Sequence, residues 1–139
     1  MNIYCAGSIK GDTSFQDFYN EIILHVESSG HTALSELNEK FKPSRSLTDK
    51  EIFKRDISWL SKSNIMIAEI SGASLGVGFE ISYSLYKLGI PVLAVYNEQA
   101  KRISAMITGG NSNLLSIKIY SDASSLRKIL TDFINKFEA

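Results

Sequence analysis

A run of small residues that ends in a carboxylate is the part of this sequence best suited to chemistry. It follows the apolar segment 64–68 and consists of Glu69-Ile70-Ser71-Gly72-Ala73-Ser74-Leu75-Gly76-Val77-Gly78-Phe79-Glu80. A loop of this kind after a buried strand offers backbone N–H groups and serine hydroxyls to an anion. We expect Glu80 to lie near the positive end of the following helix, which favours its ionised form. An ionised carboxylate beside an anion-binding loop predicts covalent chemistry on a phosphorylated sugar.

The segment Gly7-Ser8-Ile9-Lys10-Gly11 is a second candidate anion loop, since it follows the apolar residues 3–6. In that interpretation Ser8 and Lys10 donate hydrogen bonds. The alternative is a tight turn with a solvated lysine. The segment lacks the three spaced glycines of a dinucleotide fingerprint and the Gly-Lys-Ser/Thr of a Walker loop. The sequence therefore predicts neither NAD nor ATP, and we expect no cofactor.

Two further residues could act with Glu80. Asp56 lies beside the apolar stripe of a predicted helix, although an ion pair with a residue such as Arg55 would also explain it. Tyr4 lies in the first predicted strand, and its hydroxyl needs a partner when buried, which Glu80 could provide. The alternative for Glu80 is an exposed helical glutamate. No cluster of His, Cys and Asp has metal-ligand spacing, so we expect no metal.

Composition limits the class of protein. The 139 residues are 44% hydrophobic and 22% charged, which is typical of one soluble globular domain spanning 1–139. Fifteen basic residues balance fifteen acidic ones without a visible basic patch, so a nucleic-acid polymer is not an expected partner. The single cysteine excludes an intramolecular disulfide. The sequence has no signal-peptide pattern and no apolar run near roughly 20 residues, so we expect a cytoplasmic protein without a membrane span.

Apolar periodicity predicts strands that alternate with helices. The predicted strands are 3–6, 31–34, 65–68, 91–96 and 114–120. The predicted helices are 15–26, one opened by the capping box of Thr48 and Glu51, 75–88 before Gly89, a short 103–107, and 126–137. Residues 35–46 are expected to form a loop. This order favours an α/β fold, a single-domain five-stranded parallel sheet with helices on both faces, flavodoxin-like or Rossmann-like.

Taken together, these motifs resemble those of the nucleoside 2-deoxyribosyltransferase superfamily, and most closely those of its 2'-deoxynucleoside 5'-monophosphate N-hydrolases. The matching residues extend over nearly the whole chain and are Tyr4, 7–11, Asp56 with Trp59-Leu60, Ala68-Glu69, 74–78 with Glu80, and Ser104-Ala105-Met106-Ile107. The resemblance implies a five-stranded parallel α/β fold, a small-molecule deoxynucleotide substrate and no cofactor.

The resemblance also implies roles for individual residues. Glu80 would be the nucleophile that attacks the sugar C1', Asp56 would orient the substrate and assist departure of the base, and Tyr4 would position the nucleophile. Met106 would line the base pocket, and Ser104 would reach into the site from a neighbouring subunit of a homodimer. The lysine and serines of the binding set would hold the 5'-phosphate. The implied substrate-binding residues are Ser8, Ile9, Lys10, Gly11, Ser74, Gly76, Ser104 and Met106.

Two departures from the family pattern concern affinity and base preference. Lys10 stands where an arginine is common, and a lysine binds phosphate as a point charge rather than as a fork. Leu37 replaces a histidine found in some members, which leaves the preferred base open. Independently, the apolar residues of 103–107 exceed what one short helix can bury, and this surplus predicts a two-fold dimer interface.

Three functions remain open on the sequence. The first is hydrolysis of the N-glycosidic bond of 2'-deoxynucleoside 5'-monophosphates through a covalent ester on Glu80. The second is base exchange between free deoxynucleosides by a transferase. The third is a nucleotide-binding module without turnover. Hydrogen-bond donors for a 5'-phosphate favour the hydrolase. The presence of Glu80 beside Asp56 argues against the binding module.

Overall fold

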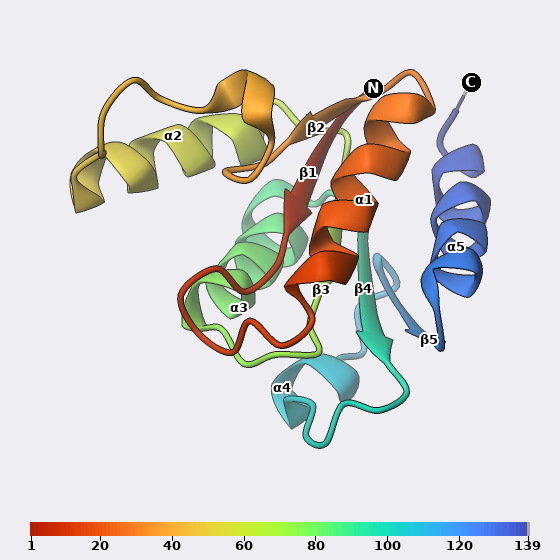
Figure 1. Cartoon of the computed structure of the whole chain (residues 1–139). Helices are drawn as coiled ribbons and strands as arrows, with labels where there is room; N and C mark the ends of the chain where they lie inside the picture. Colours follow the sequence, from red (N-terminus) through yellow and green to blue (C-terminus); the bar gives the residue numbers. More distant parts are fainter. Residues whose placement is uncertain (139) are drawn as a thin grey trace.

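Five parallel strands form the central sheet of the computed structural model, which describes residues 1–138 (Figure 1). Their order across the sheet is β2-β1-β3-β4-β5. The strands are β1 (Asn2–Ala6), β2 (Thr32–Leu34), β3 (Ile65–Glu69), β4 (Val92–Asn97) and β5 (Leu115–Tyr120). Strand β2 lies on one side of β1, and β3, β4 and β5 follow on the other side. Strands β1 and β3 therefore flank a topological switch point. Ligands of open α/β sheets bind at the carboxyl ends of such strands.

Helices connect the strands throughout the described chain. They are α1 (Gln16–Ser28), η1 (Glu39–Phe41), α2 (Asp49–Ser61), α3 (Leu75–Ser82), η2 (Tyr83–Leu88), α4 (Ala105–Thr108) and α5 (Ala123–Asn135). The predicted α/β fold class with a parallel, flavodoxin-like sheet is confirmed. Among residues 1–138, no helix has the length and apolar character needed to cross a membrane.

Two predicted segments differ in detail from the structure. The helix expected over 75–88 becomes a wider π-helix at Tyr83, with the adjacent residues Ser84 and Leu85 both buried. It ends at Gly89, which adopts the left-handed conformation that glycine allows without strain. The loop expected over 35–46 contains the short 3-10 helix η1, which the side chain of Asn38 caps.

The sheet separates two buried layers, because successive side chains of a strand point to opposite faces. Ile3 and Cys5 of β1 pack in the layer with α1 and α5, whereas Tyr4 and Ala6 pack in the layer with α3. Figure 1 shows α1 and α5 together on one face and α3 on the other. The alternation along β1 therefore places the Tyr4 side chain on the same face as Glu80 of α3.

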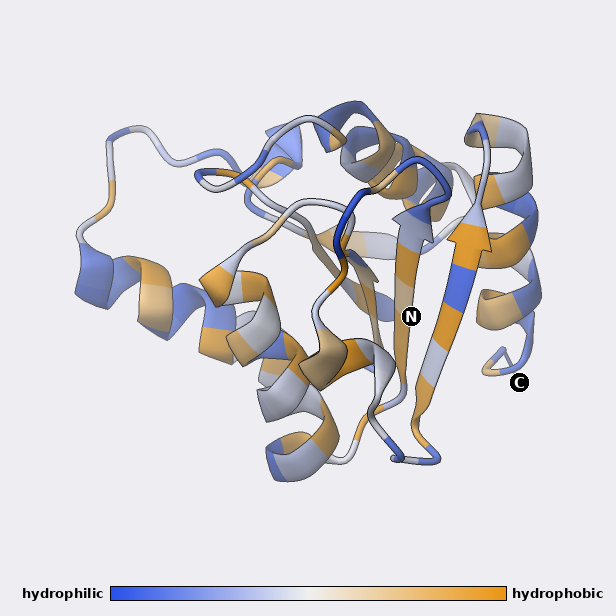
Figure 2. Ribbon diagram, turned by 90° about the horizontal axis from the view of Figure 1, so that it is seen from below, coloured by the Kyte–Doolittle hydropathy of each residue, from blue (hydrophilic) through white to orange (hydrophobic). Residues whose placement is uncertain are grey.

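Helix α2 packs on the α3 layer mainly through its C-terminal half. The capping box of Thr48 and Glu51 begins the helix, and Leu60 near its end is fully buried. Phe53, one turn into the helix, is 57% exposed. The N-terminal end of α2 extends beyond the sheet in the two ribbon views (Figures 1 and 2). The apolar stripe predicted for this helix is thus only partly covered by the rest of the chain.

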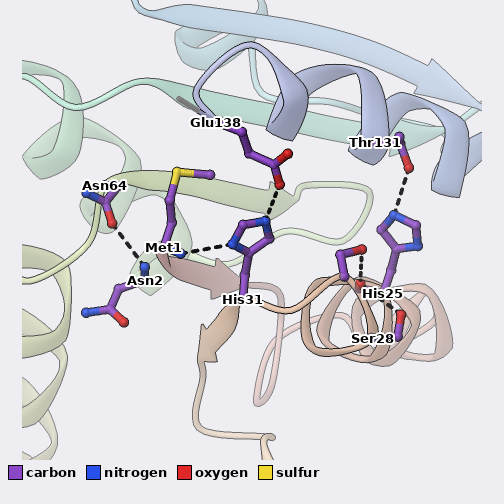
Figure 3. Close-up of polar contacts among 9 residues, drawn as sticks. Met1, Asn2, His25, Ser28, His31, Asn64, Thr131 and Glu138 are labelled. Atoms are coloured by element: carbon purple, nitrogen blue, oxygen red, sulfur yellow. Dashed lines mark hydrogen bonds and ion pairs between the residues drawn. The ribbon is translucent and has the colours of Figure 1, made fainter.

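Both histidines hold together elements that lie away from the carboxyl ends of the strands (Figure 3). His31 Nδ1 lies 2.9 Å from the N-terminal amino group of Met1, and His31 Nε2 lies 2.5 Å from Glu138 Oε1. His25 Nε2 of α1 lies 3.0 Å from Thr131 Oγ1 of α5. These contacts join α1, β2 and the end of the described chain.

The loops that follow β1 and β3 are pressed against each other. The Asp12 amide donates a hydrogen bond to the Ala73 carbonyl at 3.3 Å. A Cβ atom added at Gly72 would lie only 2.2 Å from the Asp12 carbonyl oxygen, and one at Gly11 would lie 2.3 Å from the Ala73 carbonyl oxygen. Glycine at both positions is therefore what permits the two backbones to meet.

A matched pair of glycine variants tests this close approach. Gly72→Ala is expected to lower the free energy of unfolding by about 1–3 kcal/mol, since the added methyl group forces the loops apart. Gly78→Ala is expected to raise it by about 0.5–1 kcal/mol, because alanine is the better helix residue. A Cβ at Gly78 would meet no atom within 4 Å. Urea unfolding measures both values, and equal stability of the two variants would contradict the close packing.

Candidate active site

A cleft of about 460 Å³ lies at the switch point and is lined by residues of β1, α2, α3 and the adjoining loops. Its volume is in the range of small-molecule sites. Part of its wall is apolar and includes Ile52, Phe53 and Ile57 of α2. Within residues 1–138, no group of three or more His, Cys, Asp or Glu side chains is arranged to hold a metal ion. The carboxylates that line the cleft are Glu36, Asp49, Asp56 and Glu80.

The hydroxyl of Tyr4 donates a hydrogen bond to Glu80 Oε2. Tyr4 comes from β1 and Glu80 from the second turn of α3, so this bond joins the sheet to the helix across the cleft. Burial, together with the negative charges of Glu80 and Asp56, raises the pKa of Tyr4 far above its ordinary value. The tyrosine therefore stays a proton donor to the carboxylate, in the arrangement that the sequence predicted.

Burial raises the pKa of Glu80 to about 7, and the charge of Asp56 raises it as well, while the bond from Tyr4 opposes this shift. The sequence analysis expected the helix end to favour ionisation instead. The helix dipole acts mainly within the first turn of a helix. Helix α3 begins at Leu75, so Glu80 lies beyond that turn. Desolvation therefore outweighs the dipole, and the carboxyl group titrates near neutral pH.

Asp56 lines the cleft and also forms the ion pair with Arg55 that the sequence left open as an alternative, while its role in the reaction stays a prediction. Arg55 Nε donates to Asp56 Oδ1 at 2.9 Å. The Arg55 guanidinium lies 4.7 Å from the ring centroid of Trp59 and 3.6 Å from Glu36. Burial raises the pKa of Asp56 despite the opposing effect of Arg55. A carboxyl group with a raised pKa is suited to donate a proton.

The residues predicted to bind the substrate divide among three places. Ile9, Lys10, Ser74 and Gly76 line the cleft. The Ser74 hydroxyl also caps α3 by accepting a bond from the Val77 amide at 3.3 Å.

Ser8 lies apart from this group. It is 7% exposed and directs its hydroxyl to the Ala73 carbonyl at 3.5 Å. In the single chain its hydroxyl thus holds the two loops together rather than facing the cleft.

A second hollow, of about 810 Å³, adjoins the cleft on the other side of Lys10 and Ser74. Gly11 and Ser104 line this hollow, together with Arg102. Met106 lines neither space in the single chain and is 89% exposed. Its expected place in a base pocket remains a prediction, as does the contribution of Ser104 to a neighbouring subunit.

Several residues that line these spaces were not selected from the sequence. Glu36 follows β2, Phe53 lies on the open side of α2, and Arg102 lies two residues before Ser104. Glu36 could have been identified as a cleft residue from its position just after a predicted strand. The carboxyl ends of all strands in a parallel sheet lie at one edge, where ligands bind. Helical spacing does not distinguish an apolar cleft residue such as Phe53 from a core residue, and no sequence motif marks Arg102.

The fold and the cleft define a class of protein. A carboxylate that titrates near pH 7, held by a tyrosine and faced by a second carboxyl group, lies at the switch point of a flavodoxin-like sheet. A lysine and a helix N-terminus lie at the side of the same cleft. These features define an α/β protein of flavodoxin-like topology with an acidic cleft at the carboxyl ends of its strands.

The comparisons with known proteins agree with this class. The family model described as nucleoside 2-deoxyribosyltransferase matches residues 3–118, and the chain belongs to this family. A protein of Methanosarcina barkeri with the provisional name 2'-deoxynucleoside 5'-phosphate N-hydrolase 1 is 38% identical over 95% of this chain and 84% of its own length. The mouse 5-hydroxymethyl-dUMP N-hydrolase is 33% identical over 78% of this chain and 65% of its own length.

Solved structures support the same fold. The CMP N-glycosidase of Clostridium botulinum superimposes with a TM-score of 0.68 at 14% identity, over 94% of this chain and 98% of the other. A 2-deoxyribosyltransferase of Bacillus psychrosaccharolyticus superimposes with a TM-score of 0.65 at 20% identity, over 90% and 89% of the two chains. At these identities the likeness concerns the arrangement of strands and helices.

The pKa shifts predict how activity depends on pH. If the ionised Glu80 is the reacting form, kcat/KM should rise with pH and level off above about 7, because the carboxyl loses its proton there. Asp56→Asn removes a charge that raises this pKa, so the midpoint should move to lower pH. Tyr4→Phe removes a bond that lowers it, so the midpoint should move to higher pH. Each profile is scaled to its own plateau, and midpoints that move in the same direction would contradict this electrostatic coupling.

Proposed function

We propose that this protein hydrolyses the N-glycosidic bond of 2'-deoxynucleoside 5'-monophosphates and releases the free base and 2-deoxyribose 5-phosphate. The observation that carries the proposal is the Glu80 carboxylate, held by Tyr4 in a cleft that also contains Asp56. Membership of a family that acts on deoxyribosyl bonds and the names of the relatives support the substrate class. A binding module without turnover would not need a paired carboxylate site.

The proposed reaction proceeds in two displacements at C1'. A Glu80 carboxylate oxygen bonds to C1' as the bond from C1' to the base nitrogen breaks, through an oxocarbenium-like transition state. The base leaves with a proton from Asp56 or from a water molecule. Water then attacks C1' and gives one proton to the group that protonated the base. The bond from C1' to the Glu80 oxygen breaks, and the sugar product leaves with the carboxylate regenerated. Tyr4 keeps one carboxylate oxygen fixed, so the other oxygen is available for attack.

The 5'-phosphate supplies binding energy away from the reacting carbon. Lys10 and the N-terminal end of α3 at Ser74 lie at one end of the cleft, whereas Asp56 lies on its α2 side. A phosphate bound at the first place would align C1' with Glu80. Ile9 lines the same cleft and offers an apolar surface toward the sugar.

Base exchange is the second candidate, and the family name favours it. The ester on Glu80 would be common to both reactions, and only the acceptor would differ. A second free base, instead of water, would take the sugar from Glu80. The phosphate requirement separates the candidates, because a transferase that uses free nucleosides has no need of a phosphate site.

The decisive experiment incubates the protein with deoxynucleoside monophosphates, with and without a second free base. We expect release of base and 2-deoxyribose 5-phosphate, little exchange product, and a strong loss of rate on nucleosides without phosphate. Glu80→Ala should lower kcat by about a thousandfold or more, since it removes the nucleophile. Glu98→Gln is the matched control, because Glu98 is exposed and lies outside the cleft, and it should behave like the wild type.

Two results would overturn this proposal. Near-normal turnover by a folded Glu80→Ala protein would remove the covalent mechanism. Equal rates on nucleosides and their monophosphates, with efficient transfer to the second base, would assign the protein to base exchange instead.

We further propose that the protein acts as a homodimer in which Ser104 completes the phosphate site of the partner. The support is a set of exposed apolar side chains on α3, η2 and α4. Its exposed fractions are 98% for Leu75, 51% for Phe79, 70% for Tyr86 and 89% for Met106. A surface of this kind typically marks an interface.

A subunit-mixing experiment tests the shared site. Glu80→Ala and Ser104→Arg proteins should each be nearly inactive, while their mixture should regain part of the activity. A hybrid dimer would contain one site with an intact Glu80 and an intact Ser104 from the other subunit. No recovery after mixing, with hybrid formation verified by native mass spectrometry, would assign Ser104 to its own chain.

A further inference from the structure

Arg55 lies behind the wall of the cleft that α2 forms. Its neighbour Asp56 lines the cleft, whereas Arg55 does not. Residues that are adjacent in sequence do not face each other on a helix. Nevertheless, Arg55 Nε donates to Asp56 Oδ1 at 2.9 Å, and both side chains are mostly buried. The two side chains are therefore turned toward each other, and a further contact is needed to hold the guanidinium in that place.

Trp59 provides this contact. It lies four residues after Arg55 on α2, and residues with this spacing are neighbours on a helix surface. The Arg55 guanidinium lies 4.7 Å from the centroid of the Trp59 ring. Trp59 in turn packs against Phe41 of η1, with ring centroids 5.5 Å apart. A cation is attracted to an aromatic face, and the planar guanidinium suits such stacking. The Arg55 side chain is thus held by aromatic residues of α2 and η1 where it meets Asp56.

The protein does not satisfy every donor of the Arg55 guanidinium. Among residues 1–138, Arg55 Nη2 is the only buried side-chain nitrogen or oxygen without a hydrogen-bond partner. Glu36 Oε2 lies 3.6 Å from Nη2, which is longer than a hydrogen bond. A buried donor without a partner costs free energy. Stability alone therefore does not account for an arginine here, which points to a function that it exerts through its neighbours.

The bond from Arg55 leaves one oxygen of the Asp56 carboxylate free. Oδ1 accepts from Nε, whereas no group within residues 1–138 donates a hydrogen bond to Oδ2. Oδ2 is not a buried atom without a partner either, so it is accessible from outside the chain. Glu80 has the same arrangement in the described chain, because Tyr4 donates to Oε2 and Oε1 stays accessible. Each of the two carboxylates thus has one oxygen fixed by the protein and one open to a ligand.

We propose that Arg55 is a positioning residue that presents Oδ2 of Asp56 to the departing base. This inference rests on the proposed function, because that reaction needs a proton at the base as it leaves. Arg55 acts through Asp56 and does not touch the substrate. Its charge also lowers the pKa of Asp56 and of Glu80, against the effect of burial. The other groups that face this pair are Glu36, which raises both pKa values, and Tyr4, which lowers that of Glu80.

A double-mutant cycle on kcat tests this role. Arg55→Gln is expected to lower kcat on a deoxynucleoside monophosphate about 10- to 100-fold with little change in KM, since a small misplacement of a catalytic group has an effect of this size. In an Asp56→Asn background the same substitution should have little further effect, because the group that Arg55 positions is already absent. Arg55→Lys keeps the charge without the planar fork and should recover only part of kcat. Lys54→Gln is the matched control, since Lys54 is exposed and adjacent in the chain but does not line the cleft.

Titration of the Asp56 carboxyl group by 13C NMR gives a readout that needs no turnover. Arg55→Gln removes a hydrogen bond and a charge that both lower the pKa of Asp56, so the carboxyl should lose its proton at higher pH than in the wild type. The midpoint of Arg55→Lys should lie between these two, and Lys54→Gln should leave the midpoint unchanged. If Arg55→Gln does not fold, Arg55→Lys takes its place in both measurements.

The outcomes separate this inference from the proposed reaction. An equal loss of kcat in the wild-type and Asp56→Asn backgrounds, or an equal loss from Lys54→Gln, would reject the positioning role and leave the reaction intact. An unchanged Asp56 midpoint in Arg55→Gln would also reject it. A shifted midpoint in a protein that cleaves no deoxynucleotide would support the control of Asp56 by Arg55 and reject the proposed reaction.

Discussion

The hydrogen bond from Tyr4 to Glu80 is the interaction on which the candidate site depends. Glu80 lies in a partly desolvated position that Asp56 also makes unfavourable for a negative charge. The hydrogen bond from the tyrosine hydroxyl opposes both effects on the Glu80 pKa, and the charge of Arg55 adds to it. It also fixes one oxygen of the carboxylate, so the orientation of the proposed nucleophile is determined by β1 and not by the mobility of a helical side chain. The shift of the Glu80 pKa to about 7 leaves a substantial ionised fraction at neutral pH.

The rest of the fold can be understood from what this bond requires. Strand β1 must present Tyr4 to the α3 face, and α3 must begin close enough to β3 to bring Glu80 over the sheet. Gly11 and Gly72 allow the loops after the two strands to lie against each other, which fixes the start of α3. Glu69 adds to this support, because its buried carboxylate accepts bonds from the Ser71 amide and from the Tyr120 hydroxyl. The carboxyl ends of β3 and β5 are thereby held together.

The sequence predicted a flavodoxin-like or Rossmann-like parallel sheet but not its strand order, and it named candidate residues that the structure places along the cleft. Buried apolar runs and small-residue loops identified the carboxyl ends of β1 and β3, which is why Lys10, Ser74 and Gly76 were found. Glu36 and Phe53 were missed because their relation to the cleft depends on where α2 lies. Only the carboxyl-terminal half of that helix packs against the sheet layer, and periodicity does not distinguish an apolar residue in a core from one in a cleft.

The sequence by itself determined the elements and the small-residue loops, and it named Glu80 and Asp56 as candidates, because these follow from local pattern and residue chemistry. Tertiary structure alone decided how those groups behave. Desolvation by the surrounding layer set the pKa of Glu80, against the expectation from its place in the helix. Ser8 turned to a neighbouring loop, and Arg102 joined Lys10 from a segment some ninety residues away. Burial and proximity arise from the packing of distant segments, and no spacing along the chain encodes them.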